Sequence, residues 1–99
     1  MTLVKDKDVK HILEKMIGWT FVNSSIKKVY KFDSYMSSIK FINDLAAESE
    51  EVNHHPDMAV GWCQIEIVYT SHDQGGVTEA CLEMAKKTDT IYFKKLELS

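Results

Sequence analysis

The chain has 99 residues and a mass of 11.4 kDa, so we expect one domain over residues 1–99 with a modest hydrophobic core. With 44% hydrophobic and 27% charged residues, the composition lies near the globular average, which argues against a disordered or collagen-like chain. The formal charge of −3 provides no extended basic surface for binding phosphates, so direct nucleic-acid binding is not expected.

The two cysteines indicate a reducing compartment rather than a disulfide or zinc framework. Cys63 and Cys81 stand 18 residues apart without a second pair. No apolar run approaches the ~20 residues that a membrane span needs, and residues 1–6 lack the apolar core of a signal peptide. We therefore expect a cytoplasmic protein with no membrane contact.

The first third of the chain predicts a helix followed by a hairpin. Asp6 and Asp8 favour a helix start, and apolar residues then recur every three or four positions until Gly18. These apolar positions are Val9, Ile12, Leu13, Met16 and Ile17. Residues 19–32 interleave apolar and polar side chains around Ser24-Ser25, which predicts two short strands joined by a tight turn.

A second helix is expected after Asp33 or Ser34, because either residue can cap it. Its apolar stripe consists of Tyr35, Met36, Ile39, Ile42, Leu45 and Ala46. The acidic residues at its end are Glu48, Glu50 and Glu51. They oppose the helix dipole at a cost of roughly a few tenths of a kcal/mol each, which indicates a role other than helix stability.

The second half of the chain predicts two strands and a third helix. Pro56 ends the second helix, residues 57–61 form a short strand, and the alternation over 62–70 is the best strand signal. After a turn at Gly75-Gly76, Thr78 can cap a helix. The inner face of this helix is Cys81, Met84, Ala85, Thr88, Ile91 and Tyr92. The order α-β-β-α-β-β-α predicts an α+β fold, with a four-stranded antiparallel sheet and three helices on one face.

Three of the four histidines flank the two predicted strands of the second half. His54 and His55 follow the second helix, and His72 leaves the last strand. Because antiparallel strands bring such ends together, we expect one cleft lined by these imidazoles and the carboxylate of Glu50. An imidazole titrates near ~6.5, so the cluster suits proton transfer at neutral pH.

Other interpretations of these residues stay open on spacing alone. The histidines can simply satisfy turns and helix ends. A metal site of His54, His72 and Glu50 or Asp57 is less favoured, because adjacent histidines diverge and no His-x-x-x-His pair is present. Ser71 precedes His72 without a nucleophile-elbow sequence, so a serine hydrolase is not indicated.

Two further aromatic side chains have plain interpretations. His11 lies off the apolar stripe of the first helix and is expected on the surface. Trp62 is either a core aromatic or the wall of a ring-binding pocket, and a lone tryptophan is more often core.

The chain resembles the pterin-4a-carbinolamine dehydratases, also known as dimerization cofactors of a homeodomain transcription factor. The core of the resemblance is Glu50-x-x-x-His54-His55-Pro56, then Trp62, His72 and the turn Gly75-Gly76-x-Thr78-Glu79. Looser similarity covers Trp19, Ile26-x-Lys28-x-Tyr30-x-Phe32 and the helix of 34–48 ending in Ala47-Glu48. The order of elements derived above is also the order of this family.

The resemblance implies dehydration of 4a-hydroxytetrahydrobiopterin to a quinonoid dihydropterin in tetrahydrobiopterin recycling, with neither metal nor bound cofactor. It implies that His54 and His72 are general acid and base, without saying which is which. It further implies that His55 helps to hold the pterin and that Glu50 orients an imidazole. The resemblance thus counts His55 and Glu50 with the catalytic residues. It also implies that Pro56 and Trp62 belong with His55 to the substrate-binding site, where Pro56 shapes the turn and Trp62 supports the pocket.

One position departs from the family pattern. The family usually has an acidic residue three positions after the threonine that starts the last helix, where this chain has Cys81. An acid there would close a capping box with Thr78 and interact favourably with the helix dipole. Alternatively, Cys81 packs inward as a small apolar residue, in which case a charge would be costly.

The resemblance also leaves a second class of function open. The chain can be a non-catalytic dimerization module of the coactivator type, although such a module would not need three histidines and Glu50. In either case we expect a homodimer or homotetramer, because the core is limited and members of the family self-associate. Sheet edges and helix faces are the expected contacts.

Overall fold

The computed structural model describes residues 2–98, and the side chains of residues 2–94. It contains α1 (Asp6–Leu13), β1 (Thr20–Val22), β2 (Ser25–Lys31), α2 (Tyr35–Val52), β3 (Asp57–Gly61), β4 (Gln64–Tyr69) and α3 (Glu79–Leu98). The predicted class and element order are therefore confirmed. Within the described residues, no helix is long and apolar enough to cross a membrane.

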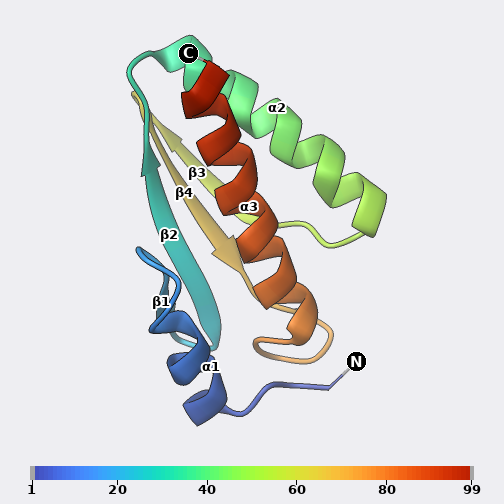
Figure 1. Ribbon diagram of the computed structural model, residues 1–99. Helices are drawn as coiled ribbons and strands as arrows, with labels where there is room; N and C mark the ends of the chain where they lie inside the picture. The colour runs from blue at the N-terminus through green and yellow to red at the C-terminus, as the bar shows by residue number, and fades with distance from the viewer. Residues whose placement is uncertain (1, 99) are drawn as a thin grey trace.

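The four strands form one antiparallel sheet in the order β1-β2-β4-β3. Figure 1 shows α2 and α3 lying across the same face of this sheet, with α1 near the start of β2. The connection from α2 to β3 and the loop from β4 to α3 lie at the same end of the molecule. This arrangement brings the two histidine-bearing segments together.

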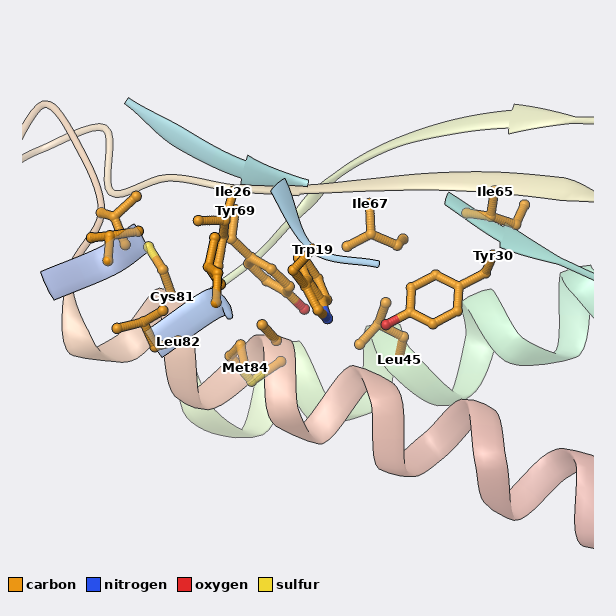
Figure 2. Packing of buried hydrophobic residues seen from close by; sticks show 14 of the residues in the cluster. Trp19, Ile26, Tyr30, Leu45, Ile65, Ile67, Tyr69, Cys81, Leu82 and Met84 are labelled. Carbon is orange, nitrogen blue, oxygen red and sulfur yellow. The ribbon is translucent and has the colours of Figure 1, made fainter. Parts of the chain in front are cut away.

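The core fills the space between the sheet and the helices. Figure 2 shows side chains from the sheet and from the helices meeting in this layer. Ile65, Ile67 and Tyr69 of β4 are fully buried, as the alternation of this strand predicts. A cluster of aromatic rings continues the layer, with ring centroids 5.1 Å apart for Tyr30 and Phe41. The inner face of α3 is also as predicted, with Cys81, Met84, Ala85 and Thr88 buried.

The first helix is shorter than predicted. It ends at Leu13, and the chain then forms tight turns in which the N–H of Met16 donates to the oxygen of Leu13. Gly18 has a φ of 90°, in the left-handed region that favours glycine. These turns direct Trp19 into the core and leave Ile17 88% exposed, so the assignment of Ile17 to an apolar helical stripe is wrong.

The second helix buries only part of the predicted stripe, in which Leu45 is buried and Ile42 packs against the core as expected. Ser34 caps the helix by accepting from the backbone N–H of Ser37, as expected. However, Tyr35 and Met36 are exposed, and the buried side chains are Ser38, Phe41, Leu45 and Ser49. The two serines tolerate burial because each hydroxyl donates to a carbonyl of its own helix.

The first hairpin turns one residue earlier than predicted. Val22 pairs with Ser25, so the turn residues are Asn23 and Ser24. Both have positive φ, at 50° and 63°, as tight hairpins with two-residue loops require.

The carboxylate of Asp89 on α3 joins the helix to the sheet. It accepts hydrogen bonds from the indole N–H of Trp19 at 3.1 Å, from Nζ of Lys28 at 2.8 Å and from the hydroxyl of Tyr30 at 2.5 Å. Lys28 and Asp89 are only 13% and 21% exposed in their side chains. Burial, followed by the hydrogen bond to Asp89, raises the pKa of Tyr30, so its phenol stays protonated and donates.

Replacing Asp89 should destabilise the fold. We expect D89N to lower the free energy of unfolding by about 1–3 kcal/mol. The three donors that bind the carboxylate of Asp89 would then face a neutral amide, which accepts fewer and weaker hydrogen bonds. D44N is the matched control, since Asp44 forms an exposed pair with Lys40 and its loss should cost under ~0.5 kcal/mol. Urea melts of both variants measure this, and equal midpoints would contradict the importance of Asp89.

Candidate active site

A cleft of about 400 Å³ lies between the end of α2 and the loop that follows β4. Its lining residues are Asn53, His54, His55, Thr70, Ser71, His72, Asp73 and Gln74. The three histidines therefore lie around one cavity, as the antiparallel strands predict. Glu50 lies one turn of helix earlier and reaches the cleft through His55.

The end of α2 projects two of these histidines. Asn53 adopts the left-handed conformation, with a φ of 53°, and terminates the helix. The backbone N–H groups of Asn53 and His54 both donate to the oxygen of Ser49, which satisfies the last turn. Pro56 then directs the chain into β3.

His54 is the most enclosed of the three imidazoles. Its ring stacks on Tyr69, with centroids 5.9 Å apart and an interplanar angle of 12°. Its Nε2 lies 3.4 Å from Sγ of Cys81. Burial first, and then the neighbouring charge of His55, lowers the pKa of His54 below its ordinary value of 6.5. His54 is therefore neutral at neutral pH and can accept a proton.

His55 and His72 each lie beside a carboxylate and are exposed. Nε2 of His55 contacts Oε2 of Glu50, so the acidic end of α2 orients this imidazole. Nε2 of His72 lies 3.8 Å from Oδ2 of Asp57, the first residue of β3. Each pair becomes an ion pair when its ring is protonated.

The loop carrying His72 is a compact turn. The oxygen of Ser71 accepts from the backbone N–H groups of Gln74, Gly75 and Gly76, and the Ser71 N–H donates to the oxygen of Gly76 at 2.8 Å. Gly75 has a φ of 77°, which explains a glycine at this position. The hydroxyls of Ser71 and Thr78 lie 2.7 Å apart and join the loop to the start of α3.

Two residues assigned to the pocket lie differently from expectation. Trp62 is 83% exposed at the turn between β3 and β4, so its interpretation as a core aromatic is wrong. It lies at the opposite end of β3 from His55 and does not line the cleft in the described chain. Its position in the turn, outside both strands, accounts for the exposure. Pro56 is partly buried beside His55 and shapes the backbone without lining the cleft.

Sequence reasoning missed several polar residues of the cleft. Asn53, Thr70, Asp73 and Gln74 line it from positions adjoining the histidines. The Asn-His-His-Pro sequence at a helix end was the available signal for Asn53, because asparagine tolerates the left-handed conformation. Among the described residues, no group of three or more His, Cys, Asp and Glu side chains is placed to hold a metal ion.

Comparison of the sequence with known protein families shows which family the chain belongs to. The family model described as pterin 4 alpha carbinolamine dehydratase matches residues 2–91. The chain belongs to this family. A Sulfolobus acidocaldarius protein that carries the family's name is 33% identical over 86 residues, covering 87% of this chain and 94% of that protein. Another, from Herpetosiphon aurantiacus, is 33% identical over 92 residues, covering 93% and 96%.

Two solved structures have a similar fold. A crystal structure named as a transcriptional coactivator/pterin dehydratase from Brucella melitensis has a TM-score of 0.88 at 24% identity, covering 92% of this chain and 99% of that chain. A pterin dehydratase-like protein identified as a RuBisCO assembly factor in the alpha-carboxysome has a TM-score of 0.63 at 25% identity, covering 75% and 86%. The names of these two structures refer to different roles.

The burial of His54 predicts its titration. Imidazole resonances followed by NMR should give His54 a pKa below 6.5. Since the folded protein binds this proton less readily than the unfolded chain, the stabilising contribution of His54 is complete above about pH 6.5 and is lost as the pH falls through its folded pKa. The H54Q variant should lose this part of the pH dependence of stability. A His54 pKa above 6.5 would contradict the enclosed environment.

Proposed function

We propose that the protein is a 4a-hydroxytetrahydrobiopterin dehydratase, which forms quinonoid dihydropterin and water in tetrahydrobiopterin recycling. The observation that carries this proposal is the convergence of His54, His55 and His72 on one cleft. Membership of the pterin carbinolamine dehydratase family supports the substrate class. The cleft volume of about 400 Å³ also lies within the range of small-molecule sites.

The reaction needs two proton transfers and no redox step. The bond between the carbinolamine carbon and its hydroxyl breaks, and that hydroxyl leaves as water after it receives a proton. A ring nitrogen loses a proton, and its electron pair forms the new C=N bond. Two positioned groups that titrate near the working pH are sufficient for this chemistry.

The environments of the histidines suggest how these roles divide. His54 has a lowered pKa and is neutral, so we assign it as the base that takes the ring-nitrogen proton. His72 is exposed beside Asp57, which can pair with its protonated ring, so we assign it as the acid. His55, oriented by Glu50, helps to hold the pterin.

A second candidate function comes from the names of the two similar structures. One related structure is named as a transcriptional coactivator and another as a RuBisCO assembly factor. A non-catalytic interaction module would need neither the histidine cleft nor the pairing of Glu50 with His55. We therefore place the dehydratase first, and the activity assay separates the two.

Substitution of the proposed acid and base should abolish turnover without unfolding the protein. With freshly generated 4a-hydroxytetrahydropterin, H54A and H72A should each lose about 10²–10⁴-fold in the spectrophotometric dehydration rate. H11A is the matched control, because His11 is an exposed histidine on α1. Circular dichroism verifies the fold of each variant, and dialysis against a chelator should leave turnover unchanged. Near-normal rates in both variants would refute the assignment of His54 and His72 as base and acid. An inactive wild-type protein would favour the interaction module.

We also propose that the protein forms a homodimer or homotetramer. Within the described chain, β3 ends the sheet, and its outer edge has no neighbouring strand. Val60 and Trp62 are exposed along this edge and at its tip. An unpaired strand offers backbone donors and acceptors to a second copy.

Light scattering should therefore give a mass of at least twice 11.4 kDa at micromolar concentration. V60K should shift the protein toward monomer, because a lysine on an edge strand opposes pairing. V22K is the matched control on β1, at the opposite edge of the sheet. A monomeric wild type would refute self-association, and dissociation by V22K alone would place the contact at the other edge.

A further inference from the structure

Cys81 lies in the first turn of α3 and contacts the proposed base directly. The side chain is 0% exposed, and Figure 2 shows it among the core side chains between α3 and the sheet. Cys81 thus packs inward, which is the alternative to a solvent-facing capping position. Its Sγ lies 3.4 Å from Nε2 of His54. Because the sulfur is buried, Nε2 points into the protein, and Nδ1 is the ring nitrogen left for a ligand.

Two hydroxyls complete the surroundings of the sulfur. Sγ of Cys81 lies 3.5 Å from Oγ of Ser71 and 3.7 Å from Oγ1 of Thr78. A thiol has one proton to donate, and its sulfur can also accept. Either hydroxyl oxygen can accept a hydrogen bond from the thiol S–H, which leaves the sulfur lone pairs to accept from an N–H of His54. The contacts therefore extend from the start of α3 and the β4–α3 loop to the imidazole.

We infer that Cys81 is a positioning residue for His54. The sulfur accepts a hydrogen bond from the Nε2–H group, fixes the tautomer that is unprotonated at Nδ1, and makes Nδ1 the proton acceptor in the cleft. Buried groups that hold the second nitrogen of a functional imidazole fix its orientation and tautomer in this way. The inference rests on the proposed function for the reaction that Nδ1 serves, but the tautomer can be measured without any substrate.

The thiol orients the ring without adding a negative charge. A carboxylate at position 81 would stabilise the protonated imidazole, whereas a thiol offers the ring only a hydrogen bond. Among the described residues, none of the contacts of His54 is with a carboxylate. A neutral imidazole is what a general base requires.

The other ionisable groups near His54 do not supply that charge. Tyr69 stacks on the ring from β4, and burial raises its pKa to about 12, so it is neutral at pH 7. His55 lowers the pKa of His54, and Glu50 of α2 contacts His55 instead. The remaining ionisable groups of the cleft are His72 and the carboxylate of Asp73, and neither is among the contacts that the described residues make with His54.

The test compares four substitutions by NMR of the His54 ring in the intact protein. C81S should keep the tautomer and the titration, because a hydroxyl also accepts from Nε2. C81A should lose the tautomer preference and reduce kcat about 10-fold or more, with KM little changed. C81D should raise the pKa of His54 by about one unit or more. The apparent pKa of the acidic limb in the pH profile of kcat/KM should rise by the same amount. C63S is the matched control and should change none of these.

The outcomes separate this inference from the proposed function. If the substitutions change the tautomer and titration of His54 but the wild-type protein has no dehydratase activity, the positioning role of Cys81 is supported and the proposed dehydratase function is refuted. A C81A variant that keeps the wild-type tautomer, or a folded C81D that leaves the His54 titration unchanged, would overturn the inference. Circular dichroism monitors folding, and if C81D does not fold, the comparison of C81S with C81A decides the question.

Discussion

Ile65, Ile67 and Tyr69 bury the inner face of β4 against the helices, and the position of every group in the cleft depends on this burial. β4 lies between β2 and β3, so it fixes the register of the whole sheet. A slip of one residue would turn all three side chains toward solvent. The register therefore holds Asp57 opposite Val68 and brings the start of β3 beside the end of β4. The end of α2 precedes β3 and the histidine loop follows β4, so the pairing of these two strands brings the helix end and the loop together.

The elements that could be predicted from the sequence are those determined by local chemistry. The strict alternation of β4, the Ser34 cap and the break at Pro56 each act over a few residues. The buried face of α2 could not be predicted from apolar residues alone. Ser38 and Ser49 enter the core because their own helix satisfies their hydroxyls, which a hydropathy pattern treats as polar. The early end of α1 likewise could not be predicted, because apolar residues continue at helical spacing to Ile17 while the chain already turns after Leu13.

The outline of the site was also predictable, because it follows from the antiparallel pairing of two strands. Histidines at the two ends of an antiparallel pair must approach each other, and the cleft contains all three. The contact between His54 and Cys81 joins residues 27 positions apart and depends on the rotation of α3, which no local pattern specifies. Trp62 shows the opposite failure, because an aromatic residue suggested burial while its hairpin position left it in solvent.

α3 carries both Cys81 and Asp89, eight residues apart, a span of about 12 Å along the helix axis. Trp19, Lys28 and Tyr30 hold one point of this helix against the sheet, and the hydroxyls of Ser71 and Thr78 hold its start. Two separate attachments restrict both the translation and the rotation of α3. The imidazole of His54 thus contacts a helix that is attached to the rest of the molecule at two points, and substitutions in the surrounding loops can accumulate during evolution without removing that support.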